Sequence, residues 1–230
     1  MFLYEGITGM SFTHVTFDLD GTVLNTIDDL AAAGNHTCEA HGWPTFSVDE
    51  YKHKVGNGML KLVERFMPEG LAQSDPELFE QVLAEFRAYY GEHSNDATAP
   101  YPGIIEMIET LKANDVCVAL LTNKDHVSAA PLIAQHFGNE CFSVVQGRIP
   151  EFPAKPDPAI TIHVMEQIDA LPQSTLYVGD SNVDILTGHN VHIKACGVLW
   201  GFRSQAELLE AGADYIASTP EELAHIILDK

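Results

Sequence analysis

The stretch Phe17-Asp18-Leu19-Asp20-Gly21-Thr22 decides the fold, and it continues the apolar, β-branched run Val15-Thr16-Phe17. That run predicts a short buried strand, and two carboxylates follow where the strand stops. Asp18 and Asp20 are two residues apart, so in an extended backbone their side chains lean toward the same side. A pair of carboxylates needs a counter-charge, and Mg²⁺, a hard cation with oxygen ligands, suits them better than a metal that prefers thiolate or imidazole. Gly21 would let a ligand approach the backbone closely.

Other apolar runs predict the rest of a sheet. Helical patterns fall between most of these runs, and such alternation is typical of a parallel sheet with helices on both faces. Thr219-Pro220-Glu221-Glu222 combines an N-cap, a proline and an N3 glutamate, so we expect a last helix that closes this part of the molecule. The further strands are predicted at residues 116–121, 142–145, 176–178 and 193–199.

The segment from about Asn25 to Ala99 predicts helices only. Ser47-Val48-Asp49-Glu50 is a capping-box pattern, and Asp75-Pro76 supplies an N-cap followed by proline at the first helical position. Because one strand precedes this segment and the others follow it, we expect an all-helical cap domain (25–100) inserted into an α/β core (1–24 and 101–230). The chain crosses between the two parts twice, which makes a natural hinge.

Composition narrows the classes of partner. Twelve basic against thirty-three acidic residues give the 230-residue chain a net charge of −21, which disfavours nucleic acid and anionic membranes as partners.

No apolar run approaches the roughly 18 residues of a membrane span, and residues 1–6 do not resemble a signal peptide, so we expect a cytoplasmic protein. The four cysteines form no Cys-x-x-Cys pair, and neither a zinc site nor a disulfide framework is expected. The sequence is compatible with a monomer or a homodimer and with translation from Met1 or Met10; residues 1–9 are expected to be an extension.

Polar residues also follow two later strands. Thr122 and Asn123 come after the strand predicted at 116–121, and Asp180 comes after the one at 176–178. Ligands bind at the carboxyl ends of strands in an open parallel sheet, so we expect these residues to meet Asp18 in one crevice. Asp180 would add a carboxylate for the cation, and Asp184 would orient the hydration of that cation from just outside it.

Lys155 is one of only twelve basic residues, and it lies between prolines in Ala154-Lys155-Pro156-Asp157-Pro158. Those prolines restrict the backbone on both sides of it. With the Thr122 hydroxyl and the backbone N–H groups near Asn123, the Lys155 ammonium would bind phosphoryl oxygens and offset their charge. The sequence therefore indicates phosphoryl transfer.

Four motifs in order carry a family resemblance: Asp18-Leu19-Asp20-Gly21-Thr22, Leu121-Thr122-Asn123, Lys155-Pro156 and Gly179-Asp180-Ser181-x-x-Asp184. They resemble the motifs of the haloacid dehalogenase-like superfamily, over the whole chain after about Phe12. The resemblance implies a Rossmann-like, doubly wound core with a helical cap inserted after the first motif. Within the superfamily the chain is most similar to the phosphoglycolate phosphatase group, through 18–26, Val55-Gly56-Asn57-Gly58, Thr122-Asn123-Lys124 and Trp200-Gly201.

The resemblance also implies roles for these residues. Asp18 would attack phosphorus and become an aspartyl phosphate, and Asp20 would protonate the leaving alkoxide and then deprotonate water. Mg²⁺ would be held by Asp18, the backbone carbonyl of Asp20 and Asp180, with Asp184 beside them. Thr122, Asn123 and Lys155 would hold the phosphoryl group. The substrate would be a small phosphorylated metabolite, and 2-phosphoglycolate is the one we expect.

The cap is expected to contribute Gly56-Asn57-Gly58, whose small residues suit a loop that packs close to the ligand, with Asn57 in contact with the substrate. Four basic cap residues, Arg65, Lys61, His53 and Lys54, are expected to be solvated or ion-paired instead. One departure from the family pattern follows Asp184. Thr187-Gly188-His189-Asn190-Val191-His192 replaces a run that usually ends in Ala-Gly, so we expect a different turn there.

Alternatives remain at this point. A β-phosphoglucomutase-like phosphotransferase shares every core residue and differs in the cap, and pyrophosphatase and nucleotidase activities use the same core. Dehalogenases and phosphonoacetaldehyde hydrolases resemble the pattern but lack the second aspartate, so carbon–halogen chemistry is disfavoured. A receiver module has a similar acidic cluster but is about half this length. A scaffold protein would be expected to lack one of Asp18, Asp20, Lys155 or Asp180, and none is missing.

Overall fold

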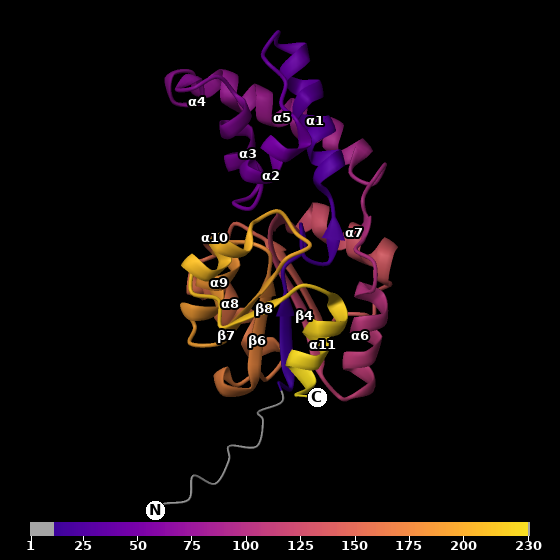
Figure 1. The fold of residues 1–230 in the computed structure, drawn as a ribbon. Coiled ribbons are helices and arrows are strands. Elements are labelled where there is room, and N and C mark those ends of the chain that lie inside the picture. Colours follow the sequence, from indigo (N-terminus) through magenta and orange to yellow (C-terminus); the bar gives the residue numbers. More distant parts are fainter. Residues whose placement is uncertain (1–11, 230) are drawn as a thin grey trace, which may run out of the picture.

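The computed structural model describes residues 12–229, and the predicted extension at residues 1–9 lies outside them (Figure 1). The centre of the molecule is a sheet of six strands that all pair in parallel with their neighbours. The strand that comes first in the chain lies in the middle of this sheet, because later strands pair on either side of it. In spatial order they are β5 (Val144–Arg148), β4 (Cys117–Asp125), β1 (His14–Phe17), β6 (Thr175–Gly179), β7 (Lys194–Val198) and β8 (Tyr215–Ala217).

Successive residues of the central strands pack on opposite faces of the sheet. In β4, Val118 and Leu120 join one apolar cluster, whereas Ala119 and Leu121 join another. The first face is covered by α6 (Ile104–Ala113), α7 (His126–Phe137) and α11 (Pro220–Leu228). The second is covered by α8 (Pro158–Gln167), α9 (Asn182–His189) and α10 (Gln205–Glu210). The predicted parallel sheet with helices on both faces is confirmed.

Two details of the sheet differ from expectation. β4 continues to Asp125 instead of stopping at Leu121, with an irregular register against β5 between these residues. Thr122 and Asn123 therefore lie within the strand, at a point where its pairing is interrupted. β8 was not predicted, because three residues are too few to show an alternating pattern.

The turn after α9 does without a glycine cap. α9 ends at His189, and Asn190 at its end keeps a right-handed helical backbone. His192 then takes the left-handed conformation, with φ 60°. The Asn190 amide donates to the Pro156 carbonyl at 2.8 Å, which ties this turn to the segment after Lys155.

Five helices form a separate lobe beyond the carboxyl ends of the strands (Figure 1), and we call residues 25–100 the cap. Ser47 and Glu50 form the predicted capping box, and Asp75 accepts from the Leu78 N–H at 3.0 Å ahead of the predicted helix. The cap has its own apolar cluster, with Tyr51, Phe66 and Phe86 fully enclosed. The helices are α1 (Ile27–Ala40), α2 (Val48–Lys54), α3 (Met59–Phe66), α4 (Leu71–Ser74) and α5 (Pro76–His93).

The two chain crossings between core and cap pair with each other. Leu24–Asn25 (β2) and Ala99–Pro100 (β3) form a short antiparallel ladder. Next to it, the buried Asp29 carboxylate accepts from the backbone N–H groups of Ala97 and Thr98 at 2.8 to 3.1 Å. The two segments that connect core and cap are thereby bonded to each other and lie side by side.

The loop between β7 and α10 makes another contact between core and cap. The Phe202 side chain belongs to the apolar cluster of the cap, although the residue comes from the core. Arg203 donates to the carbonyls of Lys52 and Val55 at the end of α2, the latter at 2.8 Å. Among residues 12–229, no helix is both long and apolar enough to cross a membrane.

Candidate active site

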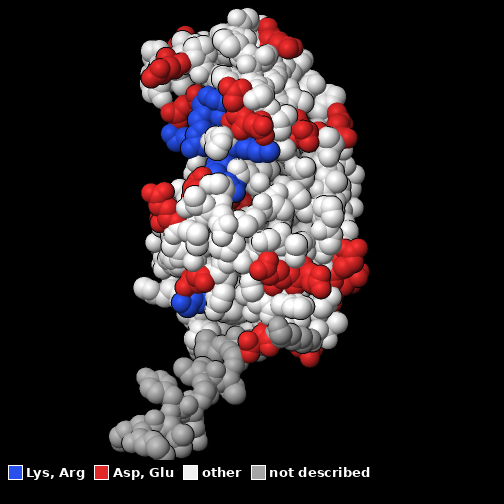
Figure 2. Space-filling model, viewed as in Figure 1, with Lys and Arg blue, Asp and Glu red and all other residues white. Residues whose placement is uncertain are grey.

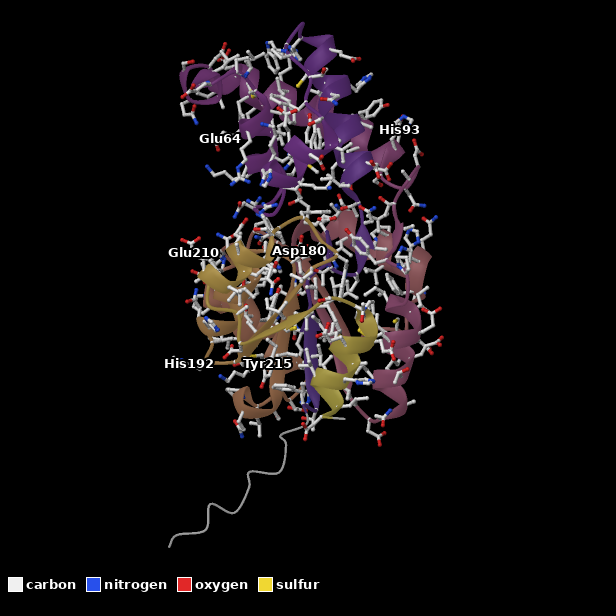
Figure 3. The ribbon with its side chains drawn as sticks, viewed as in Figure 1. Glu64, His93, Asp180, His192, Glu210 and Tyr215 are labelled. Atoms are coloured by element: carbon white, nitrogen blue, oxygen red, sulfur yellow. The ribbon has the colours of Figure 1, made fainter. Side chains whose placement is uncertain are left out.

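Three buried carboxylates meet at the end of the sheet that faces the cap. One oxygen from each of Asp18, Asp180 and Asp184 lies within 4.8 Å of the others. Asp18 directly follows β1, Asp180 directly follows β6, and Asp184 lies in the first turn of α9. Figure 3 shows Asp180 at the cap end of the core. The predicted convergence at the carboxyl ends of the strands is therefore seen for these residues.

Lys155 lies between two of these carboxylates. Its ammonium is 2.9 Å from Asp18 Oδ1 and 2.9 Å from Asp184 Oδ1. It also donates to the Leu121 carbonyl at 3.1 Å and to the Tyr177 hydroxyl at 2.9 Å. Burial alone would lower the pKa of Lys155, but the two carboxylates raise it above its ordinary value. Lys155 is therefore a fixed positive charge in this site.

The position of Asp180 is fixed by close packing of two glycines. Gly21 has φ +85°, and a Cβ there would lie 2.3 Å from Asp180 Oδ2. A Cβ on Gly201 would lie 2.2 Å from the Asp180 Cβ. The Phe202 N–H, which follows, donates to Asp180 Oδ2 at 2.6 Å. Gly21 was expected to make room for a ligand, and in the structure Asp180 takes up that room.

The carboxylate cluster has the donor set and the charge for a hard cation. Burial raises the pKa of Asp18 to about 6, and Asp184 adds to this against the opposing effect of Lys155. Burial, then Asp184 and Asp18, raise the pKa of Asp180. Three carboxylates that share a buried site with one ammonium are short of positive charge, and a cation with oxygen ligands such as Mg²⁺ would supply it.

Asp184 is placed differently from the other two carboxylates. Its Oδ1 faces Lys155, and its Oδ2 accepts from both the N–H and the hydroxyl of Ser181, at 3.1 and 2.6 Å. Both oxygens thus contact protein donors. This arrangement suits a residue that orients the surroundings of a cation, the role predicted for Asp184 from the sequence.

The side chain of Asp20 does not join the three-carboxylate cluster. Its carboxylate accepts from Lys124 Nζ at 2.9 and 3.3 Å and from the Thr26 hydroxyl at 2.7 Å. Lys124 was not predicted as a site residue, although its neighbours Thr122 and Asn123 were. Its buried ammonium, only 5% exposed, is the clearest omission. A basic residue directly after Thr122-Asn123, in so acidic a chain, was the available signal.

Thr122 and Asn123, both predicted to bind the phosphoryl group, have different surroundings in the structure. The Thr122 hydroxyl lies at the cavity described below and accepts from the Lys124 N–H at 3.2 Å. Asn123 instead commits its side chain to the protein. Its oxygen accepts from the Lys155 N–H at 2.8 Å, and its amide donates to the carbonyls of Lys155 and Gly56 at 3.1 and 3.2 Å. Asn123 thus connects the Lys155 segment to the cap.

A cavity of about 40 Å³ lies between cap and core. Polar residues of the core form one side of it, and apolar residues of the cap form most of the other. Gly56 and Gly58 of the predicted cap loop belong to its wall. Asn57, predicted to contact the substrate, turns its oxygen to Arg65 at 2.7 Å instead. The wall consists of Asp18, Asp20, Leu30, Val55, Gly56, Gly58, Met59, Leu62, Phe86, Tyr90, Thr122, Asn123, Lys124 and Asp125.

Basic residues gather beside this junction, as the blue patch in the notch between the two lobes shows (Figure 2). Arg65 donates to the Lys54 carbonyl at 2.7 Å, and Lys61 forms an ion pair of the expected kind with Glu64 at 2.6 Å. Burial and the nearby Arg203 lower the pKa of Arg65. Positive charge is therefore concentrated at the junction of cap and core, although the whole chain has a net charge of −21.

The chain is similar to proteins of one known family. A family model described as haloacid dehalogenase-like hydrolase matches residues 15–198. The phosphoglycolate phosphatase of Pseudomonas putida (strain KT2440) is 36% identical over 192 residues, which are 82% of this chain and 70% of that protein. The phosphoglycolate phosphatase of Chromobacterium violaceum is 33% identical over 212 residues, 91% of this chain and 93% of that protein.

Solved structures agree with these matches. A crystal structure from Lactobacillus delbrueckii subsp. bulgaricus superposes with a TM-score of 0.90 at 29% identity, and the match covers 96% of this chain and 100% of that one. A predicted phosphoglycolate phosphatase from Haemophilus somnus gives a TM-score of 0.85 at 28% identity, with 95% and 99% covered.

Proposed function

The chain belongs to the haloacid dehalogenase-like hydrolase family and is a phosphatase, and we propose that it hydrolyses 2-phosphoglycolate with Asp18 as the nucleophile. The observation that carries this proposal is the position of Asp18. It is 8% exposed at the end of β1, at the wall of the cavity, with Lys155 at 2.9 Å. The relatives named as phosphoglycolate phosphatases support the choice of substrate.

The proposed steps use groups of the cavity wall together with Lys155, which contacts Asp18 at 2.9 Å. The Asp18 carboxylate attacks phosphorus, and the bond between phosphorus and the substrate's bridging oxygen breaks, which leaves an aspartyl phosphate. Asp20 gives a proton to the departing alkoxide, so that glycolate leaves. Asp20 then takes a proton from a water that attacks the same phosphorus, and inorganic phosphate leaves as the Asp18 carboxylate re-forms. Lys155 and Thr122 hold the phosphoryl oxygens during both steps.

The carboxylate cluster fits Mg²⁺, and we propose that Asp18, Asp180 and the backbone carbonyl of Asp20 would hold it, with Asp184 orienting its surroundings. When bound, the ion supplies positive charge that offsets the charge of the phosphoryl oxygens. Lys155 provides a second, permanent positive charge 2.9 Å from Asp18 Oδ1.

We propose further that residues 25–100 act as a movable cap domain on a core of residues 1–24 and 101–230. The cavity lies between the cap and the core, and residues of both form its wall. We propose that the cap opens to admit substrate, with the paired crossings at β2 and β3 as the hinge. Closure would bring Gly56 and Gly58 over the ligand and exclude water.

A phosphate-release screen tests the function. With Mg²⁺ present, we expect the highest kcat/KM for 2-phosphoglycolate among that ester, sugar phosphates, nucleoside monophosphates and pyrophosphate. A higher kcat/KM for one of the others would replace the proposed substrate. Interconversion of sugar phosphates without net release of phosphate would instead identify a phosphotransferase.

Removal of Mg²⁺ has an expected effect on stability as well as on activity. At Mg²⁺ concentrations about 100 times its Kd, binding adds about 2.7 kcal/mol to the free energy of unfolding. For a chain of this length, this raises Tm by roughly 5–10 °C. Asp180→Asn should lose most of this rise, because it removes a charged ligand while its amide oxygen can still accept from Phe202. Asp28→Asn, at an exposed carboxylate in α1, is the control and should keep it. An unchanged rise in Asp180→Asn would contradict the proposed ligand set.

The proposed partner is thus a small phosphorylated metabolite, and polyanionic partners are not proposed for a chain with a net charge of −21. A monomeric or homodimeric state and a cytoplasmic location stay predictions. Sedimentation of the purified protein and fractionation of cells that express it would test them.

A further inference from the structure

Tyr90 reaches the cavity from α5 in the cap. The side chain is 2% exposed and forms part of the same wall as Asp18 and Asp20. Its ring stacks on Phe86, with the ring centroids 5.7 Å apart. Tyr90 is therefore held rigidly, with its polar end at the place where substrate would bind.

The Tyr90 hydroxyl lacks a hydrogen-bond partner. It is one of four buried side-chain polar atoms among residues 12–229 without one. Buried hydroxyls almost always have a partner, and one that lacks it at a cavity wall indicates a group that pairs with a ligand. Burial raises the pKa of Tyr90, so the hydroxyl is a neutral donor.

Lys124 lies next to this hydroxyl but cannot accept its hydrogen. The Lys124 ammonium is 4.9 Å from the centroid of the Tyr90 ring and 2.9 Å from Asp20 Oδ1. An ammonium has donors only, so the phenolic hydrogen stays unpaired however the two groups approach each other. The Tyr90 hydroxyl hydrogen and the Lys124 ammonium are therefore two donors at the cavity wall, beside the Asp20 carboxylate that Lys124 also contacts.

The apolar wall of the cavity would strengthen an ion pair or hydrogen bond between these donors and a ligand. Leu30, Met59 and Leu62 of the cap line the cavity near Tyr90 and are at most 9% exposed. In such apolar surroundings a hydrogen bond to a charged group is stronger than in water. An ionised carboxylate, which has only acceptors, complements the two donors.

We infer that Tyr90 and Lys124 form a subsite for a carboxylate at the end of the substrate remote from phosphorus. This inference rests on the proposed function, because it takes the phosphoryl group to lie at Asp18. It assigns the preference for a carboxylated phosphomonoester to one cap residue and one core residue. The subsite is complete only when the cap is closed.

The test compares two esters that differ at that end: 2-phosphoglycolate and ethyl phosphate, which has a methyl group in place of the carboxylate. We expect Tyr90→Phe to lower kcat/KM for 2-phosphoglycolate about 10-fold or more, mainly through KM, since one charge-assisted hydrogen bond is lost. Its kcat/KM for ethyl phosphate should stay within about 2-fold of the wild type. Tyr89→Phe is the matched control, because Tyr89 on the same helix stacks on His36 and His93 outside the cavity wall.

Stability supplies a second readout. The Tyr90→Phe substitution removes a hydroxyl whose hydrogen meets no acceptor in the protein, and the neighbouring Lys124 keeps its bonds to Asp20, so the Tm of the variant should be close to or above that of the wild type. A merely structural hydroxyl would lower Tm when removed. A clearly lower Tm, or a ratio of kcat/KM for the two esters equal to that of the wild type, would overturn the inference.

Failure of the proposed function would look different. If the wild type releases phosphate from neither ester, that function fails, and binding then decides the inference. In thermal shift measurements with Mg²⁺, 2-phosphoglycolate should raise the Tm of the wild type more than ethyl phosphate does, and Tyr90→Phe should lose this difference. Equal differences in the two proteins would overturn the carboxylate subsite.

Discussion

Asp18→Asn is expected to lower kcat for phosphate release by at least about 10⁴-fold, as the loss of a nucleophile does in other enzymes. An amide has the volume of the carboxylate but cannot attack phosphorus or offer a charged oxygen to Mg²⁺. Its oxygen can still accept the hydrogen bond that Lys155 makes at 2.9 Å. The variant should therefore lose its chemistry and keep its fold.

The thermal stability of Asp18→Asn can be predicted as well as its activity. In the fold, the pKa of Asp18 is raised from 3.8 to about 6, chiefly by burial. A carboxyl whose pKa is higher in the folded state opposes folding when it is ionised, so at pH 7.5 the uncharged Asn avoids a cost that the wild type bears. Without Mg²⁺ the variant should unfold at no lower temperature than the wild type, and this advantage should vanish as the pH falls below about 4.

Single-turnover phosphate release and thermal unfolding measure the two effects on one sample. Asp28→Asn, at the exposed carboxylate in α1, controls for the change of charge and should keep both activity and Tm. Mg²⁺-dependent release by Asp18→Asn at more than a small fraction of the wild-type rate would rule out Asp18 as the nucleophile.

Lys155→Met should damage both stability and activity. The ammonium contacts Asp18 and Asp184, each at 2.9 Å, and its side chain is 2% exposed. Methionine fills a similar volume but leaves two buried carboxylates without their counter-charge. Removing one partner of a buried ion pair costs about 3–5 kcal/mol, which for a chain of this length corresponds to a Tm lower by roughly 6–20 °C.

The loss of activity should exceed what unfolding explains. A donor aimed at developing charge is worth about 10²–10³-fold in kcat, so kcat measured well below the Tm of the variant should fall by about that factor. Lys112→Met removes an exposed ammonium that donates to the Glu140 carbonyl at 2.6 Å, and it should change the free energy of unfolding by no more than about 0.5 kcal/mol. A Lys155→Met protein within 1 kcal/mol of that control would contradict a structural role for the buried charge.

Local signals explain what the sequence could predict. The apolar runs of β1 and β6 are short, but each is followed at once by an aspartate, so both the strand and the place of Asp18 and Asp180 could be recognised. Ser47, Asp75 and Thr219 each cap a helix through the residue three positions later, so those helix starts depend on neighbours in sequence. The order of the motifs then indicated one crevice, because parallel strands end at the same edge of a sheet.

Expectations that depended on partners far apart in the chain were less reliable. Lys124 pairs with Asp20 across 104 positions, and no local pattern distinguishes that buried ammonium from an exposed one. Asn123 resembled a phosphate ligand, but packing places it between Lys155 and Gly56. The sequence predicts that Gly21 makes space for a ligand, but Asp180, which follows β6, occupies that space.

The sequence by itself therefore determined the class of sheet, the inserted helices and the acidic and basic residues available for phosphoryl transfer, since these follow from periodicity, capping and order along the chain. Only the tertiary structure decided which side chains remain for a ligand. Phe202 of the core enters the cap cluster, and Tyr90 of the cap joins the wall of the cavity between cap and core. Burial and pairing of such residues depend on packing between segments that are distant in sequence. The local sequence of one segment does not predict which other segment packs against it.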